Sequence, residues 1–258
     1  MTRAPDSHKG DNGKAAIIGG SLHQHGAPLF SALAAEASGV DLVYVALPEV
    51  HAQVARHSSL NFQVHPFRGD ELAREDVGPI LEMLATVDCA VIGPGLARTS
   101  SALSLVRELI ESAPCPLVLD ASALQDWTLD AVKGKQAVLT PHLGELERMG
   151  VSPQQLRAAS KKSGAVIHLK GRMDHIAAAG KSIIEVKGGN AGLTVGGTGD
   201  ALAGLICGLI AQGMKPAEAC VTASRVIKRA GTVLFQEYGY AYGTRRVIKV
   251  IPRMLLHE

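Results

Sequence analysis

The chain has 258 residues, of which 47% are hydrophobic and 3% aromatic, and its 26 basic and 24 acidic side chains leave a formal net charge of +2. A balanced charge with so few aromatic side chains for stacking on bases argues against a nucleic-acid-binding protein. The polar N-terminus and the absence of an apolar run of membrane-spanning length argue against a secretory signal or a membrane protein, so we expect a cytoplasmic protein.

Short apolar runs alternate along the chain with amphipathic stretches. The runs cover residues 15–18, 42–46, 89–92, 116–119, 137–139 and 166–169, and the clearest helical patterns cover residues 27–38, 101–112 and 153–163. Strands that are apolar throughout are buried on both faces and usually lie parallel. The alternation predicts a three-layer α/β/α fold with a mostly parallel central sheet, formed by residues 1–258 as a single domain.

The pattern changes after residue 170. Residues 176–179 and 183–186, separated by Gly180-Lys181-Ser182, predict a hairpin, so one edge of the sheet is expected to be antiparallel. An apolar helix over residues 200–212 follows, and a second helix is expected to begin at Pro216. The first helix is apolar on all sides, which predicts burial, and it is too short to cross a bilayer. Its Gly204 and Gly208, four residues apart, predict close packing against a neighbouring helix.

The clearest functional motif is Gly196-Gly197-Thr198-Gly199, which leads directly into Asp200 and this helix. Free amides and the positive end of the helix dipole bind phosphate oxygens, and glycines allow a close approach. A carboxylate in the first turn can accept a proton from a hydroxyl that attacks a phosphoryl group. We therefore predict a nucleotide phosphate site with Asp200 as catalytic base. The alternative, a simple N-cap after a turn, does not require so many glycines.

Other candidate residues follow predicted strands, at the edge where open α/β sheets bind ligands. The glycine turn Gly93-Pro94-Gly95 follows one strand, although any tight turn between a strand and a helix has this pattern. Asp120, Thr140, His142 and Glu145 follow two other strands. Each of these four alone is more often a cap or turn residue, but their position at several strand ends favours a shared site. Lys170 follows a further strand and could face phosphate, with an ordinary surface lysine as the alternative. His23 and His25 lie in a loop without an evident third ligand, so no residue is predicted to bind a metal.

Together these segments resemble the ribokinase-like superfamily and, within it, the ADP- or ATP-dependent NAD(P)H-hydrate dehydratases. The resemblance extends over nearly the whole chain. The motifs that carry it include His8-Lys9-Gly10-Asp11, Ile18-Gly19-Gly20-Ser21, Gly93-Pro94-Gly95-Leu96, Thr140-Pro141-His142, Gly144-Glu145, Leu169-Lys170-Gly171 and residues 195–204. Sugar kinases share the Gly-x-Gly-Asp site, whereas Lys9-Gly10-Asp11 and the Pro-His-x-Gly-Glu segment are typical of the dehydratases.

The resemblance implies dehydration of the S epimer of hydrated NADH or NADPH, with ADP or ATP as co-substrate and Mg²⁺ bridging the phosphate oxygens. Asp200 would act on the substrate hydroxyl, and Gly197, Thr198 and Gly199 would hold the transferred phosphoryl group. The residues implied to contact the hydrated nucleotide are Ala27, Gly95, His142 and Asp200. The residues implied to line ADP or ATP are Lys170, Gly171, Arg172, Met173 and Asp174. A homotetramer is also implied.

Three positions depart from the family pattern. Leu143 stands where a proline is usual, Ser122 where an acid is usual, and Ala97 where Gly-Leu-Gly would continue. None of these removes the predicted base. Many relatives carry an N-terminal epimerase domain, and we expect any epimerase here to be a separate polypeptide.

Two other functions remain open at this stage. A small-molecule kinase of the same superfamily would phosphorylate a sugar or a hydroxymethyl-bearing vitamin precursor and release a stable ester. A nucleotide-binding protein without catalytic activity would keep the pocket alone, although the intact Thr198-Gly199-Asp200 argues against it. Kinase and dehydratase share the phosphorylation step and differ in whether the phosphate ester survives.

Overall fold

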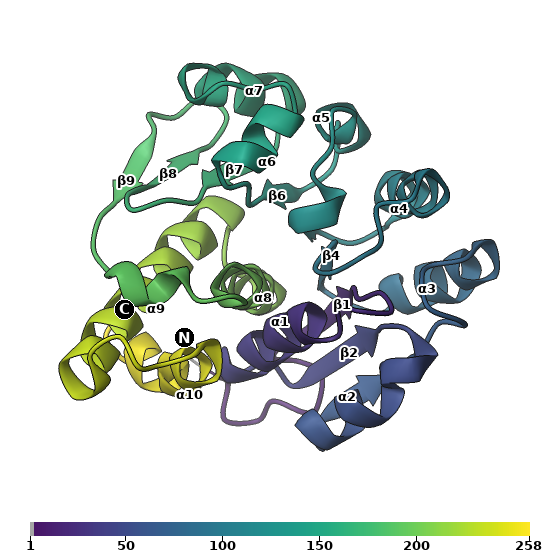
Figure 1. The fold of residues 1–258 in the computed structure, drawn as a ribbon, viewed down its shortest axis with the longest axis horizontal. Helices are drawn as coiled ribbons and strands as arrows, with labels where there is room; N and C mark the ends of the chain where they lie inside the picture. The colour runs from purple at the N-terminus through teal and green to yellow at the C-terminus, as the bar shows by residue number, and fades with distance from the viewer. Residues whose placement is uncertain (1–2) are drawn as a thin grey trace.

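A computed structural model describes residues 3–258, which form one nine-stranded sheet in the order β3-β2-β1-β4-β5-β6-β7-β8-β9 (Figure 1). The strands are β1 (Lys14–Ile18), β2 (Leu42–Ala46), β3 (Phe62–Val64), β4 (Cys89–Ile92), β5 (Leu117–Leu119), β6 (Ala137–Leu139), β7 (Val166–Leu169), β8 (Asp174–Ala177) and β9 (Ile184–Val186). Neighbouring strands from β3 to β7 are parallel, while β8 and β9 are antiparallel to their neighbours. The mostly parallel sheet and its antiparallel edge are both confirmed.

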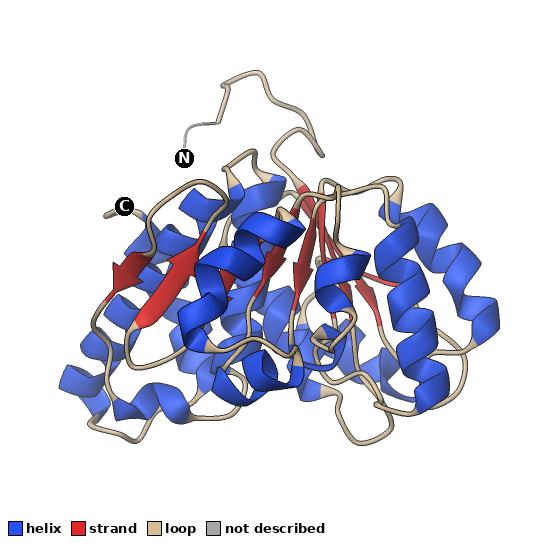
Figure 2. Cartoon of the chain, turned by 90° about the horizontal axis from the view of Figure 1, so that it is seen from above, coloured by secondary structure: helices blue, strands red, loops and turns tan. Residues whose placement is uncertain are grey.

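Helices cover both faces of this sheet (Figure 2). They are α1 (Gly26–Ala37), α2 (Ala52–Ser58), α3 (Val77–Leu84), α4 (Ser100–Ser112), α5 (Thr128–Ala131), α6 (Leu143–Arg148), α7 (Leu156–Ser163), α8 (Thr198–Ala211), α9 (Pro216–Tyr238) and α10 (Thr244–Leu255). Alternate residues of β1 enter two separate cores, Ala15 and Ile17 on the side of α1, α8, α9 and α10, and Ala16 and Ile18 on the side of α3 to α7. The three-layer α/β/α fold is thereby confirmed.

The apolar helix α8 is buried on all sides from Ala201 to Ala211 and packs against α1 and α9. Its two glycines explain the short distance to α1. A side chain at Gly204 would collide with the backbone of Ser31, and one at Gly208 would lie 2.9 Å from the Cβ of Ser38. The predicted close packing of these glycines is confirmed, and larger residues there would force the helices apart.

Several boundaries and elements differ from the sequence-based expectation. The helix predicted from residue 200 begins at Thr198, the hairpin strand predicted from residue 176 begins at Asp174, and the pattern over 153–163 divides into a 3-10 turn, Pro153–Gln155, and α7. The short edge strand β3 and the helices α2, α3, α5, α6 and α10 were not predicted. Within residues 3–258, none of the helices is both long and apolar enough to span a membrane.

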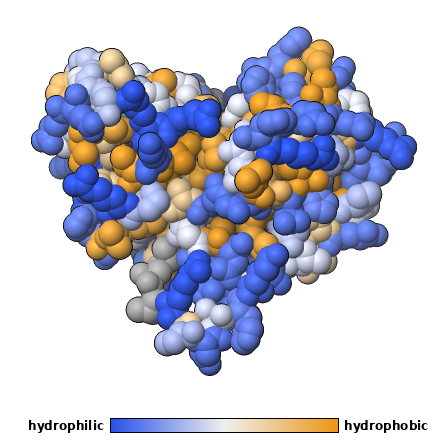
Figure 3. Space-filling view, turned by 90° about the horizontal axis from the view of Figure 1, so that it is seen from below, coloured by the Kyte–Doolittle hydropathy of each residue, from blue (hydrophilic) through white to orange (hydrophobic). Residues whose placement is uncertain are grey.

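The four cysteines, Cys89, Cys115, Cys207 and Cys220, are all buried and form no disulfide bond. The surface seen in Figure 3 is hollowed between two lobes, with apolar side chains inside the hollow and hydrophilic residues on both lobes.

Candidate active site

The polar residues predicted to share a site do lie at one end of the sheet. The loops that follow β4, β5, β6 and β7 continue the hydrogen bonding of the sheet. In each loop a backbone N–H donates to a backbone carbonyl of the neighbouring strand or of the loop after it. These bonds are Gly93 N to Ile18 O at 3.1 Å, Asp120 N to Ile92 O at 3.2 Å, Thr140 N to Leu119 O at 3.0 Å and Lys170 N to Pro141 O at 2.8 Å. The carboxyl ends of the parallel strands therefore form a rigid platform.

Helix α8 begins over this platform. Its other end lies near the start of β1, because a Cβ on Gly13 would be 2.9 Å from the carbonyl carbon of Ala211. The first turn of α8 is thus at the carboxyl ends of the strands. The amide of Thr198 donates to the carbonyl of Val195 at 3.4 Å, but in the described residues no side chain caps this helix, so the next amides of the first turn and the helix dipole remain available to an anion. This geometry supports the predicted phosphate-binding role of residues 197–199.

Gly197 is required at the start of α8 for two reasons. Its φ of 97° lies in the left-handed region that favours glycine, and a Cβ there would collide with the ring of Phe30 in α1. Thr198 continues the turn by donating its hydroxyl to the carbonyl of Val195 at 3.0 Å. The glycine-rich loop therefore allows α1 and the start of α8 to approach each other closely.

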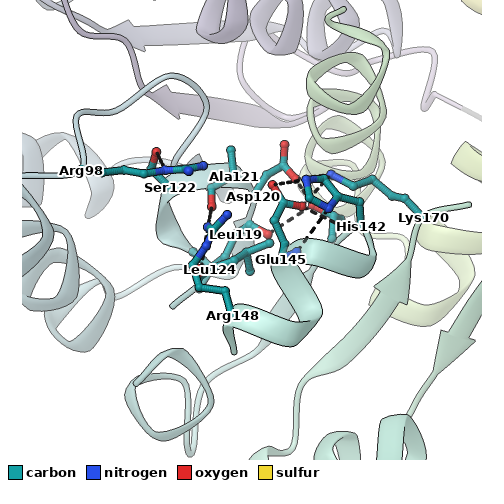
Figure 4. A network of polar contacts seen from close by, with 11 residues as sticks. Arg98, Leu119, Asp120, Ala121, Ser122, Leu124, His142, Glu145, Arg148 and Lys170 are labelled. Carbon is teal, nitrogen blue, oxygen red and sulfur yellow. Dashed lines mark hydrogen bonds and ion pairs between the residues drawn. The ribbon is translucent and has the colours of Figure 1, made fainter. Parts of the chain in front are cut away.

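Lys170 lies at the centre of a buried cluster of charges (Figure 4). Its Nζ is 2.6 Å from Asp120 Oδ1 and 3.5 Å from Glu145 Oε2. Asp120 also accepts a 2.8 Å hydrogen bond from the hydroxyl of Thr140. The Nζ of Lys170 also lies beside the first turn of α8, 3.3 Å from where a Cβ on Gly199 would be. We call Asp120, Glu145, Lys170 and Asp200 the Lys170 cluster.

The Lys170 cluster changes the acidity of Asp200. Burial and, to a smaller extent, the negative charges of Asp120 and Glu145 outweigh the opposing charge of Lys170 and raise the pKa of Asp200 to about 7. Burial would lower the pKa of Lys170, but Asp120 and Glu145 outweigh it and raise that pKa, so the ammonium stays charged. A carboxylate with a pKa near neutrality is well matched to removing a proton from a hydroxyl.

The turn after β5 positions Asp120 and is strained. Ala121 has a φ of 52°, in the left-handed region, which costs a residue with a side chain roughly 1 kcal/mol or more. Arg148 of α6 holds this turn by donating to the carbonyls of Ala121 at 3.2 Å and Leu124 at 3.0 Å (Figure 4). The sequence analysis did not identify Arg148, since nothing local to α6 indicates a contact with a turn 27 residues earlier.

Ser122, found where an acid is usual, is buried and donates to the carbonyl of Leu96 at 2.7 Å. Arg98 donates its Nε to the same hydroxyl at 3.2 Å. The serine therefore links the loops after β4 and β5 and adds no charge to the Lys170 cluster.

Besides Asp200, three residues are predicted to contact the hydrated nucleotide, and they are placed around this platform. His142 caps α6 by accepting the amide of Glu145 at its Nδ1, 3.2 Å away, and its side chain is 58% exposed. Ala27 lies in the first turn of α1 beside the loop after β4, where a Cβ on Gly95 would be 3.3 Å from the Cβ of Ala27. Ala27 and Gly95 are thus neighbours, and contact of all three residues with substrate stays a prediction.

The loop between β7 and β8 contains Lys170, Gly171, Arg172 and Met173, and Asp174 is the first residue of β8. These residues face different directions. Lys170 points into the cluster, Gly171 and Arg172 are exposed, and Asp174 is buried. Burial would raise the pKa of Asp174, but hydrogen bonds from His168, Ser224 and the Gly171 amide outweigh it and lower the pKa to about 2. Its carboxylate is engaged inside the protein, so any effect of Asp174 on a nucleotide is exerted through the loop.

Comparison with known proteins agrees with this geometry. The profile of the NAD(P)H-hydrate dehydratase family matches residues 15–253. ADP-dependent (S)-NAD(P)H-hydrate dehydratases from Cenarchaeum symbiosum and Nitrosopumilus maritimus are 34% and 36% identical to the chain. The first match covers 98% of this chain and 92% of the relative, and the second covers 92% and 86%.

Solved structures show the same relationship. The ADP/ATP-dependent NAD(P)H-hydrate dehydratase of Bacillus subtilis, co-crystallised with ATP and Mg²⁺, has a TM-score of 0.82 and 26% identity, and the match covers 99% of this chain and 93% of that one. A ribokinase from Thermotoga maritima, at 10% identity over 95% of this chain and 100% of its own, has a TM-score of 0.58 and shares the fold. The resemblance seen in the sequence motifs is confirmed, and the chain belongs to the NAD(P)H-hydrate dehydratase family.

Proposed function

We propose that this chain dehydrates the S epimer of hydrated NADH or NADPH and uses ADP or ATP as phosphoryl donor. The names of its relatives support this reaction. The observation that carries the proposal is the Asp200 carboxylate, which lies in the first turn of an uncapped helix and has a pKa raised to about 7. A base and an anion-binding helix end are thus side by side, as phosphoryl transfer to a hydroxyl requires.

In the proposed mechanism Asp200 accepts the proton of the substrate hydroxyl while that oxygen attacks the terminal phosphorus of the nucleotide. The phosphoryl group passes to the substrate, and AMP leaves from ADP or ADP leaves from ATP. The amides at the start of α8 stabilise the phosphoryl oxygens, and Lys170 offsets the negative charge nearby. The lone pair of the ring nitrogen then expels phosphate and a ring proton is lost, which restores the reduced nicotinamide.

Mg²⁺ would offset the charge of the nucleotide phosphates and is proposed to be bound mainly by them. Residues 3–258 contain no group of three His, Cys, Asp or Glu side chains arranged to hold a metal. Within the Lys170 cluster the ammonium lies between the carboxylates of Asp120 and Glu145, so these residues do not form a separate metal cage. The donor set therefore fits a metal that arrives with the nucleotide.

We also propose that the predicted contacts apply to this chain. Residues 170–174 and 197–199 would line ADP or ATP, and Ala27, Gly95 and His142 would contact the hydrated nucleotide. A cytoplasmic homotetramer with the whole chain as one domain completes the proposal, and light scattering after size-exclusion chromatography measures its oligomeric state.

The decisive experiment compares the wild type with Asp200→Asn. The protein is incubated with hydrated NADH, Mg²⁺ and either ADP or ATP, and the absorbance of the reduced nicotinamide is followed. Without its base the variant should lose roughly 10²- to 10⁴-fold in kcat while still binding ADP. Asp70→Asn, at an exposed position, is the matched control and should behave as wild type.

Near-normal turnover by Asp200→Asn would reject the mechanism. A persistent phosphate ester formed from an alcohol, with no recovery of reduced nicotinamide, would favour the kinase. Tight ADP binding without phosphate release from any hydrated cofactor would favour a binding protein.

A further inference from the structure

Lys228 is a buried lysine in the middle of α9, and its side chain contacts the loop between β7 and β8. Its side chain is 9% exposed. Its Nζ donates to the carbonyls of Gly171 at 3.1 Å and Arg172 at 3.2 Å, and it lies 3.3 Å from Asp174 Oδ1. Two backbone oxygens and one carboxylate thus surround the ammonium.

Asp174 completes this arrangement from the other side of the turn. It accepts the amide of Gly171 at 2.9 Å, the hydroxyl of Ser224 at 2.6 Å and the Nε2 of His168 at 3.1 Å. Lys228 and Asp174 together bind both the N–H and the C=O of Gly171. We call Lys228, Asp174, Ser224 and His168 the Lys228 network.

The position of this loop relates the Lys228 network to the nucleotide. Lys170, directly before the turn, extends to Asp120 and to the start of α8. Arg172, the second residue of the turn, is exposed. The network binds the backbone N–H and C=O groups of the turn. The Lys170 side chain therefore extends toward the start of α8, and the Arg172 side chain extends toward solvent.

A lysine buried only for stability would be expected to pair with a carboxylate, since an uncompensated buried charge is costly. Lys228 has such a partner in Asp174, 3.3 Å away, and in addition donates two hydrogen bonds to carbonyls of the loop itself. The orientation of the Gly171–Arg172 turn therefore depends directly on this ammonium.

We propose that Lys228 is a positioning residue for the nucleotide, holding the Gly171–Arg172 turn in the orientation that receives a nucleoside di- or triphosphate. The inference rests on the proposed function, in which residues 170–174 line ADP or ATP. Lys228 acts through the loop and has no part in the proton transfer by Asp200.

The test measures Lys228→Met, which keeps most of the side-chain volume and removes the charge and the donors. The KM for ADP and the Kd of ADP with Mg²⁺, measured by calorimetry, should both rise roughly tenfold or more, as expected when hydrogen bonds from a charged group are lost. The KM for hydrated NADH should stay within about twofold and kcat should change little, because the substrate side of the site is untouched. Lys162→Met, on an exposed position of α7, is the control for the same chemical change and should leave all four quantities unchanged.

Equal weakening of ADP and hydrate binding would overturn the proposal, because it would indicate a general loss of folded protein. Unchanged binding of both ligands would overturn it as well. If Lys228→Met does not fold, Lys228→Gln is measured instead, since its amide keeps a donor. A selective rise of about threefold in the Kd of ADP is expected there, and no rise would overturn the proposal. Failure of wild-type protein to dehydrate the hydrate would reject the proposed function alone, because the calorimetry with ADP still tests Lys228.

Discussion

The Lys170 cluster and the Lys228 network are two buried arrangements built around one lysine each, yet they affect their aspartates in opposite ways. In the first, the Asp120, Glu145 and Asp200 carboxylates share the single ammonium of Lys170, and the pKa of Asp200 is raised to about 7. In the second, the Asp174 carboxylate receives hydrogen bonds from His168, Ser224 and Gly171 besides the nearby Lys228, and its pKa is lowered to about 2.

The difference shows that burial alone does not decide the role of an acid. Burial raises the pKa of both aspartates, and the balance between neighbouring carboxylates and hydrogen-bond donors decides the final direction. An acid with too few donors can accept a proton near neutral pH, whereas an acid with many donors stays ionised and organises its surroundings. Lys170 of the first arrangement and Asp174 of the second lie at the two ends of residues 170–174, so this one segment connects the surroundings of the proposed base with the structural acid.

The largest effect on stability is expected at the structural acid. Asp174→Asn would leave Lys228 buried without a full counter-charge and should lower the free energy of unfolding by about 3–5 kcal/mol at neutral pH. Because the folded pKa of Asp174 is below its unfolded value, this stabilisation is present above about pH 4 and lost as the pH falls through about 2. Urea denaturation measures it. Asp130→Asn, which removes a carboxylate from the exposed pair with Lys133, should change stability little, and an equal loss in both variants would contradict the comparison.

The same substitution at the reactive acid should have the opposite effect. The folded pKa of Asp200 lies above its unfolded value, so the stability linked to this group is complete below about pH 4 and is lost as the pH rises through about 7. Asp200→Asn removes that loss and should be more stable than wild type at about pH 8, by a few kcal/mol at most. Denaturant titrations at about pH 5 and about pH 8 test this. If the variant is no more stable than wild type at the higher pH, ionisation of Asp200 does not destabilise the folded protein.

A smaller effect is expected from Asp120, whose carboxylate lies in the same cluster as Asp200. A base with a pKa of about 7 must lose its proton to act, so kcat/KM should rise with pH through that region. Asp120→Asn removes one negative charge and leaves more of the Lys170 charge to Asp200, so the rise should move to lower pH by about one unit. The pH profile of kcat/KM measures the shift, with Glu147→Gln at an exposed position of α6 as control. An unmoved profile would mean that Asp120 does not influence the base.

Much of the fold follows from local sequence patterns. Strands such as residues 89–92 and 166–169 are apolar throughout because both of their faces are buried, and the sequence predicted them at these positions. Elements with weaker patterns were missed for a related reason. β3 has only three residues with one buried at the sheet edge, and α6 has six residues of mixed polarity, so neither shows a clear period.

The sequence by itself determined the alternation of the clearest strands and helices, the placement of the glycine-rich loop at the start of α8, and the choice of Asp200 as the candidate proton acceptor, because each depends on residues adjacent in the chain. Only the tertiary structure brought Asp120, Glu145 and Lys170 around the helix that contains Asp200, and only it placed Arg148 and Lys228 against loops far away in sequence. The physical reason is that a pKa depends on charges and hydrogen-bond donors near in space. These groups come from different strands and helices, and packing of the sheet decides which of them meet.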